Sequence, residues 1–583
     1  MRRTFRSSLS ARLLAVAGGA ALCFSAASAI SPTAATACGC FAPPDPSVPI
    51  VQAGERILFA HENGQVTAYI QVQYSGKPGE FGWLLPLPAV PKTKAGTDGI
   101  DVSVDELFTQ LLSTTQPKYR LTRVYDECGN NPNSRNTPTS AAFGDADSGG
   151  SVPPQSPPSP LVVQDSVGPY DYAVLKADNK DLMVKWLNDN HYFIPSGTLD
   201  AAAPYLRPGA YFLALRLRAG LAAGDLQPVV LRYQSDLPMI PIILTSVAAQ
   251  PNMGIQVWML GAGRAIPRNY YHTVINDSQI DWLTSGQNYN DVIIKAVGEA
   301  DGHHSFVTEY AGQSAVMQKV LNRPGRFGDL TALAQVKDPA SFVQAVFNNG
   351  FTINGQLTSI LARYIPEPAA LKAQNLSLTQ YYQNINFYLG QDRAMNPGKY
   401  ADIATALMNF DPKMATDELT TKVVQPTLDA GQVFDAFPYL TRLYTTLSPV
   451  DMNKDPVFSY NPSLPDYSNV HQATLTYHCA GFFAKNRYDN ATLQTESGFV
   501  LNMSADDANA NKWTAPAVPF SQQIQTLSEV GPPQTVVDNT GIIKSGLGTG
   551  GCSMIGFGGT GASSAAGLLL ASAGMLLARR RRR

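Results

Sequence analysis

Residues 55–74 read ERILFAHENGQVTAYIQVQY. Between Val66 and Val72, apolar residues alternate with polar neighbours, which is typical of a strand with one buried face. Asn63-Gly64 separates this run from the apolar run before it, and the dipeptide favours a two-residue turn because both residues tolerate a positive φ. The sequence therefore predicts an antiparallel β-hairpin that presents one face to a core.

Similar patterns along the chain predict an α+β fold. Apolar alternation or short apolar runs predict strands at 81–87, 119–125, 161–166, 210–217, 228–233, 240–246, 254–260, 473–479 and 498–503. Apolar residues at helical spacing predict helices at 104–114, near 179–188 and between 316 and 447. We expect the strand at 81–87 to continue the sheet of the hairpin.

Shifts in composition divide the chain into eight segments. We expect a signal peptide at 1–37, a β-rich N-terminal domain at 38–128, a Pro/Ser/Gly-rich linker at 129–160, an α+β region at 161–312, a helical subdomain at 313–450, an irregular and partly β-stranded region at 451–530, a Gly/Pro-rich stalk at 531–551 and a transmembrane sorting tail at 552–583.

Composition excludes several classes of protein. The 583 residues are 44% hydrophobic and 15% charged, with 42 Pro and 47 Gly, which excludes wholesale disorder and disfavours a coiled coil. Nine of the arginines lie in the two ends. The rest of the chain carries 34 basic and 45 acidic residues, a net charge of −11. An acidic body argues against nucleic acid as a partner.

The N-terminus has the pattern of an export signal. Arginines precede an apolar run at 13–24, and the small-residue motifs at 27–29 and 35–37 offer two cleavage sites. The run is too short to favour a permanent membrane anchor. Arg2-Arg3 leaves the twin-arginine route open beside the general secretory route.

The C-terminus has the pattern of a membrane-sorting tail. Cys552 follows a Gly-rich stretch, the segment 561–578 is apolar, and five arginines end the chain. A helix over the apolar segment is about 27 Å long, close to the thickness of a bilayer core. This order resembles the MYXO-CTERM class of sorting signals, which implies processing near Cys552 and delivery to the cell surface. A plain single-span anchor is the alternative.

Four cysteines remain for the exported body, namely Cys38, Cys40, Cys128 and Cys479. In an oxidising compartment they predict two disulfides. One residue separates the first two, so they are badly placed to bridge each other, and we expect each to bond with one of the later two. The alternative, a metal site, would take its ligands from Cys38, Cys40, His478 and Cys479, although the chain has no C-x-x-C pair.

Several strings resemble a known family. They are CGCFAPP at 38–44, VQAGER at 51–56, GEFGWLLPLP at 79–88, YYH at 270–272, FVTEY at 306–310 and LTRLYTTLSP at 440–449. Together they resemble the domain of unknown function 2330 family of exported bacterial proteins, from residue 38 to about residue 520. The resemblance implies export and a disulfide role for Cys38-Gly39-Cys40. It implies no catalytic residue, because the family has no established activity.

The sequence predicts no catalytic residue, no cofactor-binding residue and no metal ligand. G-x-S-x-G, S-x-x-K, H-E-x-x-H and P-loop signatures are absent. His61-Glu62 runs into a turn. His303-His304 with Glu309 offers ligand types for a metal, but adjacent residues of a strand point to opposite faces. His478-Cys479 offers a base and a nucleophile, but by the same argument their side chains point to opposite faces of a strand.

Calcium is the one cofactor for which partial motifs exist. Alternating oxygen ligands occur at 145–150, at Asp451-x-Asn453-x-Asp455 and at Asp507-x-Asn509-x-Asn511. Each lacks the Gly or the bidentate Glu of a complete loop, so solvated turns are the competing interpretation.

These observations favour an exported protein of the cell envelope, anchored or sorted through its tail, with a binding or structural role. Its expected partners are the membrane, through the tail, the export and sorting machinery, and an envelope protein or glycan. One alternative is a secreted hydrolase of the glycosidase or peptidase type whose active site comes from distant parts of the chain, with two facing carboxyls or a Ser/His/Asp cluster as its signature. The other is an envelope chaperone or assembly factor.

Overall fold

The computed structural model describes residues 51–75, 82–91, 99–128, 160–192, 197–218, 225–481 and 486–548. The expected signal peptide and sorting tail, Cys38, Cys40, Cys552 and almost all of the expected linker lie outside these residues. No helix in the described part of the chain is long and apolar enough to cross a bilayer.

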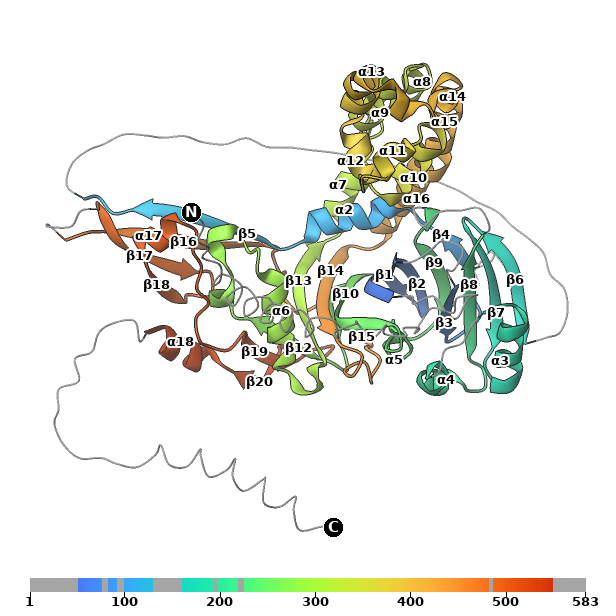
Figure 1. The fold of residues 1–583 in the computed structure, drawn as a ribbon. Coiled ribbons are helices and arrows are strands. Elements are labelled where there is room, and N and C mark those ends of the chain that lie inside the picture. The colour runs from blue at the N-terminus through green and yellow to red at the C-terminus, as the bar shows by residue number, and fades with distance from the viewer. Residues whose placement is uncertain are drawn as a thin grey trace, which may run out of the picture.

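The largest sheet of the described residues, here the main sheet, has ten strands and draws on almost the whole described chain (Figure 1). In spatial order these are β20 (Gln534–Asp538), β19 (Ser521–Thr526), β12 (Tyr271–Ile275), β13 (Ser305–Gln313), β14 (Tyr439–Leu447), β10 (Ala249–Gly261), β1 (Val51–Glu62), β2 (Gln65–Ser75), β9 (Val229–Gln234) and β4 (Ile100–Val102).

The predicted hairpin is confirmed. β1 and β2 pair antiparallel from Glu62↔Gln65 outward, and the turn residues Asn63 and Gly64 have φ values of 52° and 71°. On its other side β1 pairs parallel to β10, as in Ile57↔Val257. The hairpin is therefore an interior part of the main sheet.

A second sheet packs on one face of the main sheet. Its order is β3 (Gly82–Leu87), β8 (Tyr211–Leu217), β7 (Tyr170–Lys176) and β6 (Leu161–Val167). The expectation that β3 continues the hairpin sheet is wrong, because β3 pairs with β8. Pro86 has no N–H to donate and suits this edge position. Trp83 and Leu85 belong to the same buried cluster as Ile57 of β1.

A third sheet joins a strand from early in the chain to three strands from late in the chain. Its order is β18 (Val500–Ser504), β17 (Tyr488–Thr495), β16 (Val470–Cys479) and β5 (Lys118–Tyr125), with β5 parallel to β16. A disulfide between Cys128 and Cys479 closes the end of this pair of strands. The expected bonds from Cys38 and Cys40 to these cysteines are therefore wrong.

The predicted helical region fills the connection between β13 and β14, which are neighbours in the main sheet. Figure 1 shows it standing away from the sheets. Helical spacing is confirmed as far as Ala436; beyond it the chain returns as β14. The elements are α7 (Ala315–Leu321), α8 (Leu330–Leu333), α9 (Pro339–Asn348), α10 (Gly355–Tyr364), α11 (Ala369–Lys372), α12 (Leu378–Gln383), η7 (Phe387–Asp392), α13 (Arg393–Met395), η8 (Pro397–Tyr400), α14 (Ala404–Met408), α15 (Pro412–Leu419), η9 (Thr420–Val424) and α16 (Gln425–Ala436).

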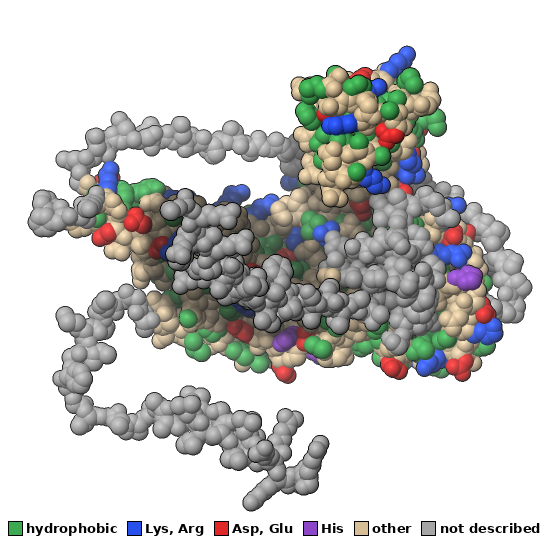
Figure 2. All heavy atoms as spheres, viewed as in Figure 1, with side chains coloured by type: hydrophobic (Ala, Val, Ile, Leu, Met, Phe, Trp, Pro, Cys, Tyr) green, Lys and Arg blue, Asp and Glu red, His purple; other side chains and the backbone are tan. Residues whose placement is uncertain are grey.

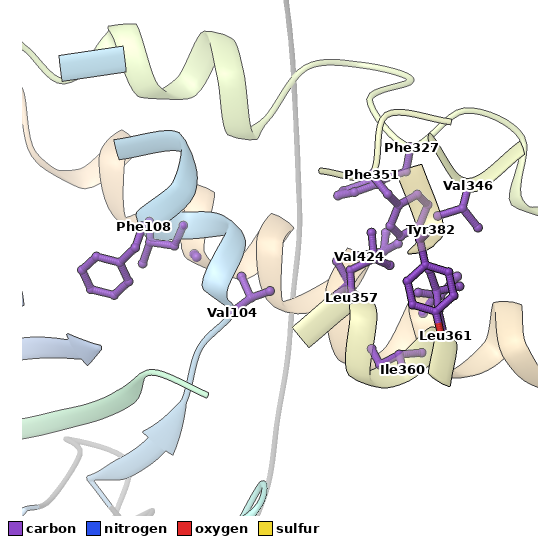
Figure 3. Close-up of a cluster of buried hydrophobic side chains, with 14 of the residues drawn as sticks. Val104, Phe108, Phe327, Val346, Phe351, Leu357, Ile360, Leu361, Tyr382 and Val424 are labelled. Carbon is purple, nitrogen blue, oxygen red and sulfur yellow. The ribbon is translucent and has the colours of Figure 1, made fainter. Parts of the chain in front are cut away.

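The helix α2 (Asp105–Thr115) connects this region to the main sheet. Figure 3 shows Val104 and Phe108 in the same buried cluster as Leu357 and Ile360 of α10. The carboxylate of Glu106 forms a buried ion pair with Arg326 of the helical region. Apolar burial and this pair fix α2 between the helical region and the main sheet.

The remaining described elements are short, apart from three longer helices. They are α3 (Lys180–Asp189), α4 (Thr198–Ala202), η2 (Ala203–Tyr205), α5 (Ile242–Thr245), β11 (Arg264–Pro267), η4 (Asp277–Gln279), η5 (Trp282–Thr284), α6 (Tyr289–Gly298), η6 (Asp301–His303), β15 (Phe458–Asn461), α17 (Ala505–Asn509) and α18 (Thr540–Gly548). β11 and β15 pair in a two-stranded sheet.

Two stretches differ from the sequence-based expectation. The strand predicted at 240–246 is wrong, because α5 forms there after Pro241, which cannot donate to a sheet ladder. Residues 534–548, expected as part of a stalk, form β20 and α18 instead. The fully buried Ile543 of α18 packs with Phe499 and Val518, which holds this end of the chain on the body.

Glu55 brings a carboxyl into the core between the main and second sheets. Strand alternation places it on the same face of β1 as Ile57 and Phe59, and its side chain is buried. Among the described residues, its Oε2 has no hydrogen-bond partner. Burial alone raises the pKa of Glu55 from 4.5 to about 7.

We predict that the disulfide contributes strongly to stability. The two cysteines are 351 residues apart, and closing so long a loop stabilises the folded chain by on the order of 5 kcal/mol in the chain-entropy model. The double variant Cys128→Ser/Cys479→Ser should unfold at a clearly lower urea concentration than the wild type. Equal urea midpoints for the two proteins would contradict this prediction.

A second prediction concerns the pH dependence of stability. The folded chain keeps the Glu55 proton up to about pH 7, whereas the unfolded chain loses it near pH 4.5, so stability falls as pH rises through this window. Glu55→Gln should therefore stabilise the protein at about pH 8 by up to ~3 kcal/mol, at ~1.4 kcal/mol per pKa unit, and much less at about pH 5. Urea unfolding of both proteins at the two pH values measures this difference. Glu529→Gln, at an exposed acid, is the control and should show no such difference.

Candidate functional site

A polar cavity of about 440 Å³ lies at one end of β1 and β10. Its walls come from four strands of the main sheet, from α6 and from the residues that follow α2. The lining residues are Gly54, Glu55, Arg56, Gln116, Pro117, Asn252, Gly254, Gln256, Tyr289, Asn290, Glu309, Arg442 and Tyr444.

Two glycines open the floor of the cavity. Gly54 and Gly254 are paired across β1 and β10. A Cβ atom on Gly254 would lie 2.8 Å from the hydroxyl oxygen of Tyr444, which is too close for any side chain. Glycine at this position therefore leaves room for the Tyr444 side chain and for the space beside it.

The next row of residues places three polar side chains on one face. Arg56 pairs with Gln256 across β1 and β10, and Gln256 pairs with Tyr444 across β10 and β14. Residues opposite each other in a sheet share a face. The sheet thus presents a guanidinium, an amide and a phenol side by side.

A β-bulge brings Glu309 to the same face. The register of β13 against β14 shifts between Thr308 and Tyr310, which makes Glu309 the extra residue. Its carboxylate accepts hydrogen bonds from the Tyr289 hydroxyl (2.7 Å) and from Nε2 of Gln256 (3.3 Å). It also forms an ion pair with Nε of Arg442.

Arg442 is fixed by several further contacts. Its Nη1 donates to the carbonyl oxygen of Leu112 (3.3 Å) and to Oγ1 of Thr115 (3.2 Å). Its guanidinium lies 5.4 Å from the centre of the Trp258 ring. The Arg442 and Glu309 side chains are only 5% and 1% exposed, so removing either one would leave a buried charge unpaired.

The guanidinium of Arg56 makes a different set of contacts from that of Arg442. Its Nη1 donates to Oε1 of Gln71 (3.1 Å), and Nε2 of Gln71 donates to the Asp105 carboxylate (2.8 Å). Burial lowers the pKa of Arg56, Asp105 opposes this effect and Arg442 adds to it. Burial also raises the pKa of Asp105. Gln71 thus bridges the guanidinium of Arg56 and the carboxylate of Asp105.

The two phenols of the cavity are neutral. Burial, with Glu309 nearby, raises the pKa of Tyr289 well above its usual value, and burial raises the pKa of Tyr444 to about 12. The Tyr444 hydroxyl donates to Oδ1 of Asn290 at 2.9 Å. The cavity therefore combines one ion pair, one further guanidinium, amides and neutral hydroxyls, an arrangement suited to hydrogen-bonding a polar molecule.

The arrangement does not supply the facing acids of a glycosidase. Glu55 and Glu309 both border the cavity. However, strand alternation sends the Glu55 carboxyl to the face opposite Arg56, whereas Glu309 contacts Gln256 and Arg442 on the helical side. The main sheet separates the two carboxyls, and acid-pair hydrolysis needs them to flank one bond.

The structure separates the histidine pair from Glu309. His303 ends the short helix η6, and both imidazoles contact one loop: Nδ1 of His303 lies 3.2 Å from Oδ1 of Asp451, and Nε2 of His304 lies 2.9 Å from the Asp451 carbonyl oxygen. The expectation that strand geometry makes the two imidazoles diverge is wrong, because they do not lie within a strand.

In the partial calcium motifs of the described residues, the carboxylates accept hydrogen bonds from the protein itself. Asp451 accepts from the backbone N–H of Ser448, while Asp455 accepts from the Tyr205 hydroxyl and the N–H of Ile243. Asp507 lies in the first turn of α17. Throughout the described ranges, no three His, Cys, Asp or Glu side chains are placed to hold a metal ion. The motif at 145–150 lies outside these ranges.

The remaining histidine motifs and three of the tryptophans contact other parts of the fold. His61 stacks on Tyr460 near the hairpin turn. His478 lies between the Asp126 carboxylate (2.9 Å) and the Thr492 hydroxyl (2.8 Å), beside the disulfide-bonded Cys479. Three tryptophans, Trp83, Trp258 and Trp282, are core residues.

Sequence reasoning missed this cavity as a site. A signal was present: Glu309 and Arg442 are charged residues within otherwise buried strands, and such charges are normally paired. The partners of Glu309 and Arg442 come from distant segments of the chain, so the sequence alone could not show which residues pair.

The comparisons with known proteins give a family but no activity. The model of a family described as an uncharacterized protein conserved in bacteria (DUF2330) matches residues 32–335. Over residues 32–335 this match confirms the resemblance inferred from the motifs; its extension to about residue 520 and the resemblance of the tail to a MYXO-CTERM signal stay predictions. No curated protein and no solved structure matches the chain. The matched range includes Arg56, Gln256 and Glu309, whereas Arg442 and Tyr444 follow it. The chain belongs to the DUF2330 family of bacterial proteins.

Proposed function

We propose that this protein is an exported binding protein of the bacterial cell envelope that takes a small polar solute into the cavity at the end of β1 and β10. The cavity itself is the observation that carries the proposal. Its volume of about 440 Å³ lies within the range of small-molecule sites.

The buried contacts around Glu309 support a binding role. The carboxylate accepts from three donors on three different elements, β10, α6 and β14. Side chains held in this way lose little further freedom when a solute arrives, which lowers the entropic cost of binding. The wall is preorganised for recognition.

The proposed envelope location rests on the two ends of the sequence and on the disulfide. A bond between Cys128 and Cys479 suits an oxidising compartment. The N-terminal pattern supports export, and the tail supports anchoring or sorting through residues 552–583. Partners would be the membrane, through the tail, and the export and sorting machinery.

Surface charge supports a solute-binding role over binding of nucleic acid. On the face seen in Figure 2, basic and acidic side chains are interspersed in the coloured parts. A nucleic-acid site would need a broad basic stripe. We therefore propose that recognition takes place in the cavity.

A substitution that narrows the cavity should weaken solute binding measurably. The wild type is incubated with the polar metabolite fraction of the bacterium, bound solutes are identified by native mass spectrometry, and their affinities are measured by calorimetry. Gly254→Ala should weaken binding by at least about ten-fold, equivalent to ~1.4 kcal/mol, because the new methyl group displaces Tyr444. Gly390→Ala is the matched control, since a Cβ atom there meets nothing within 4 Å. Equal solute affinity in both variants, or no bound solute in the wild type, would refute the proposal.

The C-terminal tail at 552–583 leads to a prediction about the cell fraction in which the protein is found. Cells producing the wild type, Cys552→Ala or a deletion of 552–583 are fractionated, and the intact mass of each product is measured. We expect the deletion variant in the medium and the wild type in the envelope fraction. Identical fractions for all three would contradict the sorting role.

A further inference from the structure

We infer that the solute bound in the cavity is an uncharged molecule rich in hydroxyl groups, a sugar or a similar polyol, and that three carboxamide side chains at the opening of the cavity bind its hydroxyls. The solute class goes one step beyond the binding role proposed above and rests on it. The three side chains, here the rim amides, are those of Gln116, Asn252 and Asn290.

The rim amides come from three different parts of the fold. Gln116 directly follows α2, Asn252 lies in β10 and Asn290 lies in the first turn of α6. All three residues border the cavity and are exposed to solvent, so they lie where the cavity opens. Each side chain carries one acceptor oxygen and one amino group with two hydrogens to donate.

The hydrogen-bonding capacity of the rim amides is largely unused. Oδ1 of Asn290 accepts from the Tyr444 hydroxyl at 2.9 Å, and Oδ1 of Asn252 lies 3.5 Å from the Ser448 hydroxyl. Within the described ranges, the amino groups of Asn252 and Asn290 donate no hydrogen bond, and the Gln116 side chain forms none. Donors and acceptors at the opening are therefore available to a solute.

Two phenols beside the rim amides supply further acceptors. The Tyr444 hydroxyl donates to Asn290 and the Tyr289 hydroxyl donates to Glu309. Each phenolic oxygen can still accept a hydrogen from a solute, and both phenols are neutral because burial raises their pKa values. Each hydroxyl of a polyol both donates and accepts, so a mixture of amides and neutral phenols suits it.

The charged groups of the cavity wall already have protein partners. Glu309 forms an almost fully buried ion pair with Arg442. Arg56 donates to Gln71, which donates to Asp105. A charged solute would compete with these partners for Glu309 or for a guanidinium, and a partner displaced in a buried place costs free energy. An uncharged solute requires no such exchange.

The cavity has room for a sugar beside the rim amides. Its volume of about 440 Å³ is near the lower end of the range for small-molecule sites. A Cβ atom on Gly254 would lie 2.8 Å from the Tyr444 hydroxyl oxygen. The glycine therefore keeps space open next to the hydrogen bond between Tyr444 and Asn290.

The experiment compares sugars of different charge on the full-length protein. Thermal unfolding and calorimetry are recorded with glucose, galactose and mannose, and with the anionic uronate and the cationic 2-amino form of each sugar. We expect at least one uncharged sugar to raise the melting temperature and to bind at least about ten-fold more tightly than its charged forms, or ~1.4 kcal/mol. Added sodium chloride should leave this binding unchanged, because the solute carries no charge to be screened.

The solutes identified from the metabolite fraction give a second result. They should be uncharged and rich in hydroxyl groups. This result supports the inference for a polyol other than the three sugars as well.

Variants then locate the contact. Gln116→Ala and Asn290→Ala should each weaken binding of the uncharged solute by at least about three-fold, since each removes hydrogen bonds to it. The double variant should weaken it by at least about ten-fold, or ~1.4 kcal/mol. Gln335→Ala is the matched control and should bind as the wild type does, because Gln335 is an exposed glutamine between α8 and α9 that is not among the lining residues. If Asn290→Ala does not fold, Gln116→Ala carries the test.

The possible failures are distinguishable. Captured solutes that are charged or lack hydroxyl groups, and whose binding is weakened by Gly254→Ala, would overturn the inference and leave the binding role intact. Polyol binding that persists unchanged in the variants lacking rim amides would also overturn it. If the wild type binds neither the sugars nor any solute of the metabolite fraction, both the inference and the binding role fall.

Discussion

The structure depends on the parallel pairing of β1 with β10. Parallel strands cannot be joined by a tight turn, so the chain must make a long connection between them. Here that connection holds β2, the whole second sheet and α2. On its other edge β10 pairs with β14, and the helical region occupies the connection that leads into β14. Both excursions therefore begin and end on neighbouring strands of the main sheet.

The cavity is a consequence of where that ladder ends. The register of β1 against β10 shifts between Gln52 and Gly54, and the glycines beyond this shift leave a gap on the side of the sheet that faces α2. Desolvated charges then border open space: Arg442 and Glu309 form an ion pair, and Arg56 donates to Gln71. Burying such groups is costly unless they are hydrogen-bonded, and nearly every polar group of the wall that we describe has a partner. Such a hydrogen-bonded polar wall beside open space is the feature on which the proposed solute binding rests.

The site also shows how a family match and a structure complement each other. The family model covers Arg56, Gln256 and Glu309, but Arg442 reaches the cavity from a strand about a hundred residues beyond the matched range, on the far side of the helical region. The second half of the chain thus completes a site that begins in the first half. The helix α2 connects this site to the helical region. Its Thr115 accepts a hydrogen bond from Arg442, and its Glu106 forms an ion pair with Arg326.

Short-range patterns in the sequence were enough for most local structure. Alternation and Asn63-Gly64 predicted the hairpin, and helical spacing predicted α2, α3 and the region from α7 to α16. These features depend on residues a few positions apart, whose backbone preferences and burial are local. Tertiary structure alone decided that β3 joins β8 instead of the hairpin, that Cys128 bonds to Cys479, and that a bulge turns Glu309 towards Arg442. Strand alternation states which face of a strand is buried but not which distant strand lies beside it, because the same apolar face fits many partners; the choice is made by packing the whole chain at once.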